Sequence, residues 1–241
     1  MTARAQRRPA AGSLERRAAA REWLRCATRP SEEGGVVVKL CGMSREQDVD
    51  AACDARADLC GFIVDFPKSH RSVTPERLAQ LTAHLEARTG EGGLPWRVGV
   101  FVDAPAENIA RIVRECGLDL VQLHGHETPA DVQALRLAAP ELGIIQAFRV
   151  RTADDVAHAC ESRADVVLLD NGQGTGQAFD WSCTARADRP FLLAGGLGPD
   201  NVADAVAQVR PWGVDMSSGI ETDKLKDPVK MKAAVAAAKG A

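Results

Sequence analysis

Short apolar runs alternate along the chain with longer stretches that mix apolar and charged residues at helical spacing. The runs begin at Val36 and are rich in Val, Ile and Leu. This alternation predicts repeated βα units built around a parallel sheet. The eight predicted strands are Val36–Leu40, Leu59–Val64, Arg97–Phe101, Leu118–Leu123, Gly143–Arg149, Val166–Leu169, Phe191–Ala194 and Gly213–Met216.

Residues that can cap a helix precede several of the intervening stretches, whereas the glycines between Leu169 and Phe191 predict only a short or weak helix there. Eight strands with their helices in about 205 residues predict a (β/α)8 TIM barrel over residues 36–241. An open doubly wound sheet is the alternative. The predicted caps are Ser44 with Gln47, Thr74 before Pro75, Thr128 before Pro129, and Asp200 or Asn201.

Residues 1–35 differ in composition from the rest of the chain. They hold eight Arg against four Glu and lack the uninterrupted apolar region of a secretory leader. We expect a basic N-terminal extension that is solvated and partly disordered, in which residues 14–26 are compatible with a short helix. A basic tail for an acidic partner is the alternative interpretation.

The overall composition argues against several classes of function. A formal net charge of −3 gives the whole molecule no electrostatic footprint for nucleic acid, and no apolar run approaches the roughly 20 residues that span a bilayer. The seven cysteines form no C-x-x-C pair and have no histidine at zinc-like spacing. We therefore expect a reduced, cytoplasmic protein without a metal site.

In a TIM barrel the active site lies at the carboxyl ends of the strands, so polar residues that follow the apolar runs are the candidates. Two of the predicted strands are followed by Gly-rich or Ser-rich loops, in the segments "LLAGGLGPDN" and "GVDMSSGIE". The last two loops of such a barrel commonly hold a phosphate through backbone N–H groups. The candidates are Cys41, Arg71, Asp103, His124, Arg149, Asp170, Asp215, Gly195, Gly196, Ser217, Ser218 and Gly219.

Strand alternation gives Cys41 a direction. If Val38 and Leu40 pack against the helices, Lys39 and Cys41 point into the barrel mouth. The Lys39 ammonium would then favour the thiolate of Cys41. A buried structural cysteine is the alternative from spacing alone, just as each strand-end aspartate could be a helix cap and His124 could be structural.

Seven segments together resemble the phosphoribosylanthranilate isomerase family, the barrel enzymes of tryptophan biosynthesis. The resemblance runs from about Val36 to the C-terminus, and its most specific elements are K-x-C-G and S-S-G-x-E. In chain order the segments are "VVVKLCGMS", "GFIVDFPKSHRSVTPE", "VGVFVD", "GLDLVQLHG", "FDW", "LLAGGL" and "VDMSSGIE".

The resemblance implies an Amadori rearrangement of N-(5-phosphoribosyl)anthranilate that needs no metal or cofactor. It implies Cys41 as general base, Asp170 as general acid and Arg71 as the partner of the anthranilate carboxylate. Lys39, His124 and Asp215 would line the substrate site of a monomer or homodimer that binds a small phosphosugar. The implied phosphate-binding residues are Gly174, Gly176, Gly195, Gly196, Ser217, Ser218 and Gly219.

Two alternative functions remain at this point. Bifunctional sugar-phosphate isomerases that also serve histidine biosynthesis are similar barrels, but they place an aspartate where this chain has Cys41, and the phosphate loops here lie only in the second half. A catalytically silent phosphosugar-binding barrel would keep the loops around Gly195 and Ser217 but could lose Cys41 or Asp170, and both are present.

Overall fold

Eight parallel strands close into a barrel in the computed structural model, which describes residues 13–26, 35–90, 93–170 and 181–241. Closure is made by β1, which pairs with both β2 and β9. All eight predicted strands are confirmed, with ends that differ by at most two residues. They are β1 Val37–Cys41, β2 Leu59–Val64, β4 Trp96–Phe101, β5 Leu120–Leu123, β6 Gly143–Arg149, β7 Val166–Asp170, β8 Phe191–Ala194 and β9 Gly213–Met216, and the short β3 Ser72–Val73 pairs beside β2.

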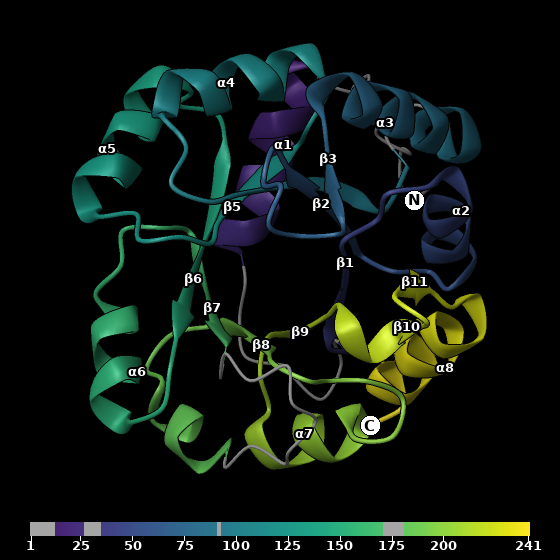
Figure 1. Cartoon of the computed structure of the whole chain (residues 1–241). Helices are drawn as coiled ribbons and strands as arrows, with labels where there is room; N and C mark the ends of the chain where they lie inside the picture. Colours follow the sequence, from purple (N-terminus) through teal and green to yellow (C-terminus); the bar gives the residue numbers. More distant parts are fainter. Residues whose placement is uncertain (1–12, 27–34, 91–92, 171–180) are drawn as a thin grey trace, which may run out of the picture.

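Helices surround the strands as an outer ring (Figure 1). The outward-facing Val, Leu and Ile side chains of the strands pack against the inner faces of these helices to form the larger apolar core. A short 3-10 helix, η1 Trp181–Arg186, stands before β8, where the sequence predicted a weak helix. The ring helices are α2 Glu46–Asp54, α3 Pro75–Thr89, α4 Ala106–Glu115, α5 Pro129–Ala138, α6 Ala153–Cys160, α7 Val202–Val209 and α8 Pro228–Lys239.

Of the four predicted helix caps, two are confirmed and one is wrong, and Asn201 stands at the predicted N-cap position of α7 without a capping side-chain hydrogen bond. The hydroxyl groups of Thr74 and Thr128 accept hydrogen bonds from backbone N–H groups in the first turns of α3 and α5. The capping box predicted for Ser44 and Gln47 is absent from α2. That helix begins later, at Glu46, and the Asp48 carboxylate instead accepts from the backbone N–H groups that precede it.

A helix from the N-terminal segment, α1 Leu14–Arg25, lies across the barrel end opposite the strands' carboxyl ends (purple in Figure 1). Leu24 and Ala20 are fully buried within the apolar cluster that fills the barrel interior. The Trp23 ring packs with its centroid 5.2 Å from that of Trp212 and 6.2 Å from that of Trp96. Residues 14–25 are therefore packed, and not solvated as expected, because an apolar helix face meets an apolar barrel floor.

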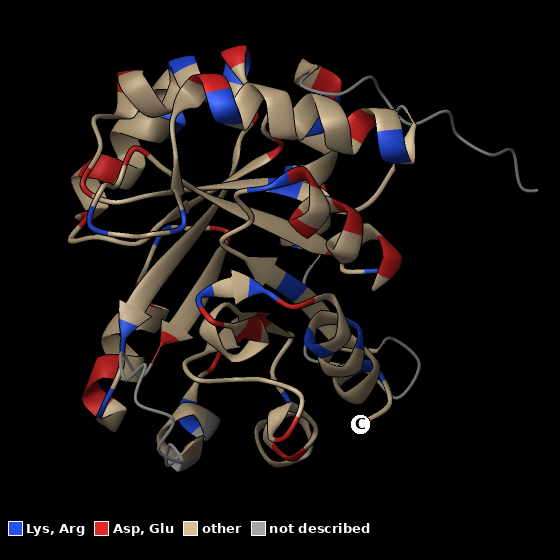
Figure 2. Ribbon diagram, turned by 45° about the vertical axis from the view of Figure 1, so that its right-hand side comes forward, with Lys and Arg blue, Asp and Glu red and all other residues tan. Residues whose placement is uncertain are grey.

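A buried ion pair fixes α1 to the barrel. Arg16 donates through Nε and Nη2 to the two carboxylate oxygens of Asp119, at 2.6 and 2.9 Å, and both side chains are fully buried. The Arg16 guanidinium also lies 4.7 Å from the ring centroid of Trp96. Elsewhere both signs of charge are interspersed along the outer helices (Figure 2). Within the described ranges no helix has the length and apolar character that crossing a membrane requires.

Candidate active site

A cavity of about 370 Å³ opens at the carboxyl ends of the strands. Its apolar wall includes Ile63, Phe66 and Val100. Five of the predicted strand-end side chains meet in this one cavity although they are far apart in sequence. These residues are Cys41, His124, Arg149, Asp170 and Asp215.

The alternation of β1 aims Cys41 into the cavity, as predicted. Val38 and Leu40 are fully buried in the core between strands and helices, whereas Cys41 lines the cavity. Lys39 shares the face of Cys41 but is fully buried and does not line the cavity. Lys39 can therefore influence a bound molecule only through the residues that it contacts.

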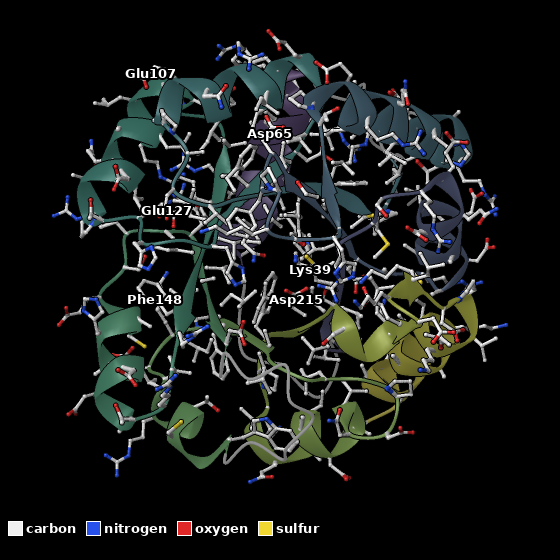
Figure 3. All side chains as sticks on the ribbon, viewed as in Figure 1. Lys39, Asp65, Glu107, Glu127, Phe148 and Asp215 are labelled. Atoms are coloured by element: carbon white, nitrogen blue, oxygen red, sulfur yellow. The ribbon has the colours of Figure 1, made fainter. Side chains whose placement is uncertain are left out.

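Lys39 is held by Asp215, its neighbour across the β1–β9 pair (Figure 3). The distance from Lys39 Nζ to Asp215 Oδ1 is 2.9 Å. Burial alone would lower the pKa of Lys39, but the negative charges of Asp215 and ionised Cys41 outweigh it and raise that pKa above its ordinary value. Lys39 is therefore a permanent positive charge next to Cys41.

Burial raises the pKa of the Cys41 thiol, and Lys39 opposes this rise without cancelling it. The Asp215 carboxylate adds to the rise, while Lys226 also opposes it. The sequence predicted that Lys39 would lower the pKa of Cys41. Lys39 does act in that direction, but removal of the thiol from water is the larger effect.

Gly61 leaves the space in which Cys41 and Lys39 meet. It is the direct neighbour of Cys41 across the β1–β2 pair. A Cβ atom at this position would lie 2.8 Å from Cys41 Sγ and 3.0 Å from Lys39 Nζ, so any larger residue would displace both groups. The sequence pattern did not single out Gly61, because its importance depends on the pairing of two strands.

Asp170 and His124 face each other on the opposite side of the cavity. The distance from His124 Nε2 to Asp170 Oδ2 is 3.7 Å. The other ring nitrogen, Nδ1, lies 2.6 Å from the side-chain amide Nε2 of Gln122, which is fully buried on β5. Gln122 thereby sets the orientation of the imidazole that adjoins Asp170.

The two predicted phosphate loops lie together at the edge of the cavity. Gly195, Gly196, Ser217 and Ser218 all line it. The loops touch where the backbone of Gly219 packs against the loop after β8. That loop is in turn fixed by a side chain at the start of α7, Asn201, whose amide Nδ2 donates to the Gly196 carbonyl and whose Oδ1 accepts from a backbone N–H.

The family model for N-(5'phosphoribosyl)anthranilate (PRA) isomerase matches residues 38–237. The chain belongs to this family. The N-(5'-phosphoribosyl)anthranilate isomerase of Chromohalobacter salexigens is 45% identical over 206 residues, which cover 81% of this chain and 90% of the relative. That of Symbiobacterium thermophilum is 42% identical over 230 residues, covering 84% and 98%. The resemblance noted in the sequence is thereby confirmed.

Solved structures of phosphoribosylanthranilate isomerases have the same fold. The enzyme from Thermotoga maritima is 34% identical and superposes with a TM-score of 0.73, covering 86% of this chain and 100% of its own. A family structure in complex with reduced 1-(o-carboxyphenylamino)-1-deoxyribulose 5-phosphate is also 34% identical, with a TM-score of 0.72 and the same coverage. The predicted barrel is therefore the fold of this isomerase family.

Arg71, for which the resemblance implies contact with the anthranilate carboxylate, stands at the rim of the cavity without lining it. Its backbone N–H donates to the hydroxyl of Ser69, which does line the cavity. Its guanidinium is held by Glu221, with distances of 2.5 Å from Nε to Oε1 and 2.6 Å from Nη2 to Oε2. Glu221 was part of the S-S-G-x-E motif, but nothing in that motif indicated this contact.

A second cavity of about 570 Å³ adjoins the first and shares Phe66, His124, Arg149 and Asp170 with it. Phe148 adds an aromatic wall to this second cavity (Figure 3). Asp103, another predicted strand-end candidate, lies outside both of these cavities and accepts a hydrogen bond from the backbone of His126. Asp103 is therefore a loop-stabilising residue.

Two residues of this chain that the resemblance implied for phosphate binding, Gly174 and Gly176, lie outside the described residues. In the described part of the chain, no group of three or more His, Cys, Asp or Glu side chains could hold a metal ion. Within the residues that the structure describes, no two cysteines are joined by a disulfide bond. The sequence patterns did not indicate the contacts of Gly61, Glu221 or Lys226. Lys226 is buried, and its Nζ donates to the backbone carbonyl of Ser217 in the loop after β9.

Proposed function

We propose that this chain catalyses the Amadori rearrangement of N-(5'-phosphoribosyl)anthranilate to 1-(2-carboxyphenylamino)-1-deoxyribulose 5-phosphate in tryptophan biosynthesis. One observation carries the proposal: Cys41 and Asp170 line the same cavity, and the phosphate-type loops around Gly195 and Ser217 form its edge. This arrangement supplies a base, an acid and an anion site to one small sugar phosphate.

Asp170 acts as the general acid in the first step. Its carboxyl proton passes to the ribose ring oxygen while the C1–O bond breaks and the nitrogen lone pair forms the C=N bond of a Schiff base. The imidazole of His124, oriented by Gln122, stands beside the carboxylate that remains. A nearby N–H group stabilises the charge that develops on Asp170.

Cys41 acts as the general base in the second step. Its thiolate removes the proton from C2 of the sugar, and the electron pair moves to form the C1=C2 bond of an enolamine. The enolamine becomes the ketone when C1 gains a proton and the C2 hydroxyl loses one. The buried ammonium of Lys39 stabilises the thiolate for this step, because it lies on the same strand face.

The two ends of the substrate are negatively charged and need separate partners. Backbone N–H groups and hydroxyls of the loops with Gly196, Ser217 and Ser218 suit the phosphate. The guanidinium of Arg71 suits the aryl carboxylate, because its N–H groups form a planar fork. A family structure holds a reduced product with both anionic groups, which supports this assignment.

The direct test is the loss of substrate fluorescence when purified protein is mixed with freshly generated phosphoribosylanthranilate. We expect turnover by the wild-type chain with no added metal, including after treatment with EDTA. If the wild-type protein does not consume the substrate, the proposed activity is ruled out. Turnover would also exclude the alternative of a silent phosphosugar-binding barrel.

A bifunctional isomerase that also serves histidine biosynthesis remains the second candidate. The position of Cys41 argues against it, because the resemblance to that group would place an aspartate at the end of β1. An assay of the same preparation with the aminoaldose phosphate of histidine biosynthesis distinguishes the bifunctional enzyme from an isomerase that acts only on phosphoribosylanthranilate. We expect no turnover of that substrate.

We also propose a cytoplasmic location and a monomer or homodimer that binds small phosphosugars. The lack of a disulfide bond among the cysteines of the described residues supports a reducing compartment. A Thermotoga maritima relative is described as dimeric. Sedimentation of the purified chain measures whether this protein is a monomer or a homodimer.

The division of the chain into an extension of residues 1–35 and a catalytic barrel of residues 36–241 also stays a prediction. Truncation of the first 35 residues tests it.

A further inference from the structure

A small hairpin follows the phosphate loop after β9 and carries two buried charges. Its strands are β10 Glu221–Thr222 and β11 Leu225–Lys226, and Glu221 pairs with Lys226 across it. The side chains of Glu221 and Lys226 are only 7% and 2% exposed, and Lys226 Nζ lies 2.8 Å from Glu221 Oε1. Neither residue lines the cavity of about 370 Å³ at the carboxyl ends of the strands, called the central cavity below. Neither of them takes part in a step of the proposed reaction.

Glu221 fixes the orientation of Arg71. It accepts from the Nε and Nη2 groups on one side of the guanidinium, which is a two-point contact that sets the plane of the group. The two N–H groups of Nη1 and the second N–H of Nη2 remain on the end of the guanidinium. That end can bind a second carboxylate while the side stays on Glu221.

Lys226 fixes the phosphate loop. Its Nζ donates to the backbone carbonyl of Ser217 at 2.9 Å and lies 3.4 Å from the Ser217 hydroxyl oxygen. The Ser217 hydroxyl donates to the carbonyl of Cys41 at 3.2 Å. One continuous set of contacts thus runs from Arg71 through Glu221 and Lys226 to Ser217 and the end of β1.

Glu221 supplies the negative charge that lies between the two cations of this set. Burial alone would raise the pKa of Glu221, but hydrogen bonds from Arg71 and Lys226 lower it, so the carboxylate is ionised at neutral pH. Without that negative charge, two cations would face each other in a largely buried place. Arg71 and Lys226 can therefore stay close to each other because Glu221 lies between them.

The hairpin itself is anchored by contacts from two other elements. Arg45 Nη2 donates to the Lys226 carbonyl at 3.2 Å, and Lys230 Nζ from α8 donates to the Glu221 carbonyl at 2.8 Å. The stem of Arg71 passes beside Gly42, where a Cβ atom would lie 2.6 Å from Arg71 Cδ. These contacts restrict the positions of both the Glu221 carboxylate and the Arg71 guanidinium that it holds.

We propose that Glu221 and Lys226 are positioning residues that hold the carboxylate-binding arginine and the phosphate loop at a fixed separation. The inference rests on the proposed isomerase function. Glu221 sets the free end of Arg71 for the aryl carboxylate, and Lys226 sets Ser217 for the phosphate. The pair therefore keeps the group that binds the aryl carboxylate and the group that binds the phosphate in a constant relation to each other.

The test compares Glu221→Gln, Glu221→Asp and Lys226→Met with a matched control, Asp165→Asn. Asp165 also forms a buried ion pair, 2.5 Å from Arg136 Nη2, but it lies at the opposite end of the barrel, just before β7. Steady-state kinetics separate kcat from KM, inorganic phosphate serves as a competitive inhibitor, and thermal unfolding reports stability for every variant.

We expect Glu221→Gln to raise KM roughly tenfold with kcat lowered less than about threefold, as for the loss of one charge-assisted contact. Glu221→Asp should recover part of that loss. Lys226→Met should weaken inhibition by phosphate roughly tenfold. Asp165→Asn should lower the unfolding temperature and leave KM and phosphate inhibition unchanged.

Two results would overturn the inference. If Glu221→Gln and Lys226→Met lower the unfolding temperature like Asp165→Asn but leave KM and phosphate inhibition within about twofold, the pair serves stability only. If Glu221→Gln raises KM equally in wild-type and Arg71→Met backgrounds, Glu221 does not act through Arg71. Absence of turnover in the wild type would instead refute the proposed function, whereas phosphate binding can still be followed by thermal shift.

Discussion

Lys39 and Asp215 are direct neighbours on the two strands that close the barrel, and their charged groups are 2.9 Å apart. The pair lies immediately behind Cys41, and Lys39 is fully buried there. A buried cation that is neutralised by one carboxylate can still influence a second acidic group. The charge state of Cys41 therefore depends in part on Lys39, a buried residue that does not line the cavity.

The pH dependence of kcat/KM tests this relationship. Because burial raises the pKa of Cys41, the thiol loses its proton at higher pH than a carboxylic acid does. Turnover needs the ionised form of Cys41, and the fraction of that form falls as the pKa of the thiol rises. We expect a bell-shaped profile whose basic limb belongs to Cys41.

Removing the Lys39 charge should move that basic limb to higher pH. In Lys39→Met the pKa of Cys41 rises, and each unit of rise lowers the plateau of kcat/KM about tenfold. The double variant Lys39→Met with Asp215→Asn is the control, because it removes the carboxylate that is left unpaired. An unchanged basic limb in both variants would show that Lys39 does not tune Cys41.

The catalytic pair can be tested with matched controls from the same chain. We expect Cys41→Ser and Asp170→Asn each to lower kcat by about 10²-fold or more, as for groups that transfer protons. Cys60→Ser and Asp103→Asn change the same residue types outside the central cavity. Per folded molecule, these controls should keep near-normal kcat. Near-normal turnover in a Cys41 or Asp170 variant would remove that residue from the mechanism.

Much of this site could be predicted because it depends on local periodicity. Strand ends and side-chain alternation follow from the apolar pattern, so the pattern alone was enough to orient Cys41 correctly. The contacts that could not be predicted join distant parts of the chain, such as Arg71 with Glu221. Their formation depends on strand pairing and loop paths, which the one-dimensional pattern does not contain.

The packing of α1 illustrates a different limit. Its sequence is rich in Arg and Ala, which indicated a solvated segment. The structure of the barrel floor explains why Arg16 is buried and Trp23 partly buried, because Asp119, Trp96 and Trp212 are their partners there. When only the sequence is known, a charged residue is expected to be exposed, because the partner that would allow its burial cannot be identified.

Gly61→Ala should impair catalysis without preventing folding. The added methyl group would press on Cys41 Sγ and Lys39 Nζ, which lie 2.8 and 3.0 Å from its position. We expect kcat to fall by about 10-fold or more, because a small misplacement of a base is costly to proton transfer. KM should change little, because Gly61 contacts no predicted phosphate or carboxylate partner. Iodoacetamide labelling of Cys41 would report its altered position independently.

The N-terminal helix should contribute to stability and not to catalysis. Arg16→Met leaves the fully buried carboxylate of Asp119 without its ion-pair partner, which is expected to cost about 3–5 kcal/mol of unfolding free energy. Arg16→Met with Asp119→Asn should recover part of that loss, and Arg25→Met should change little because Arg25 is exposed. Urea unfolding measures the free energies. Removal of residues 1–35 should likewise lower stability yet leave kcat unchanged, because α1 covers the barrel end opposite the cavity; a fall in kcat of the folded, truncated protein would contradict this separation.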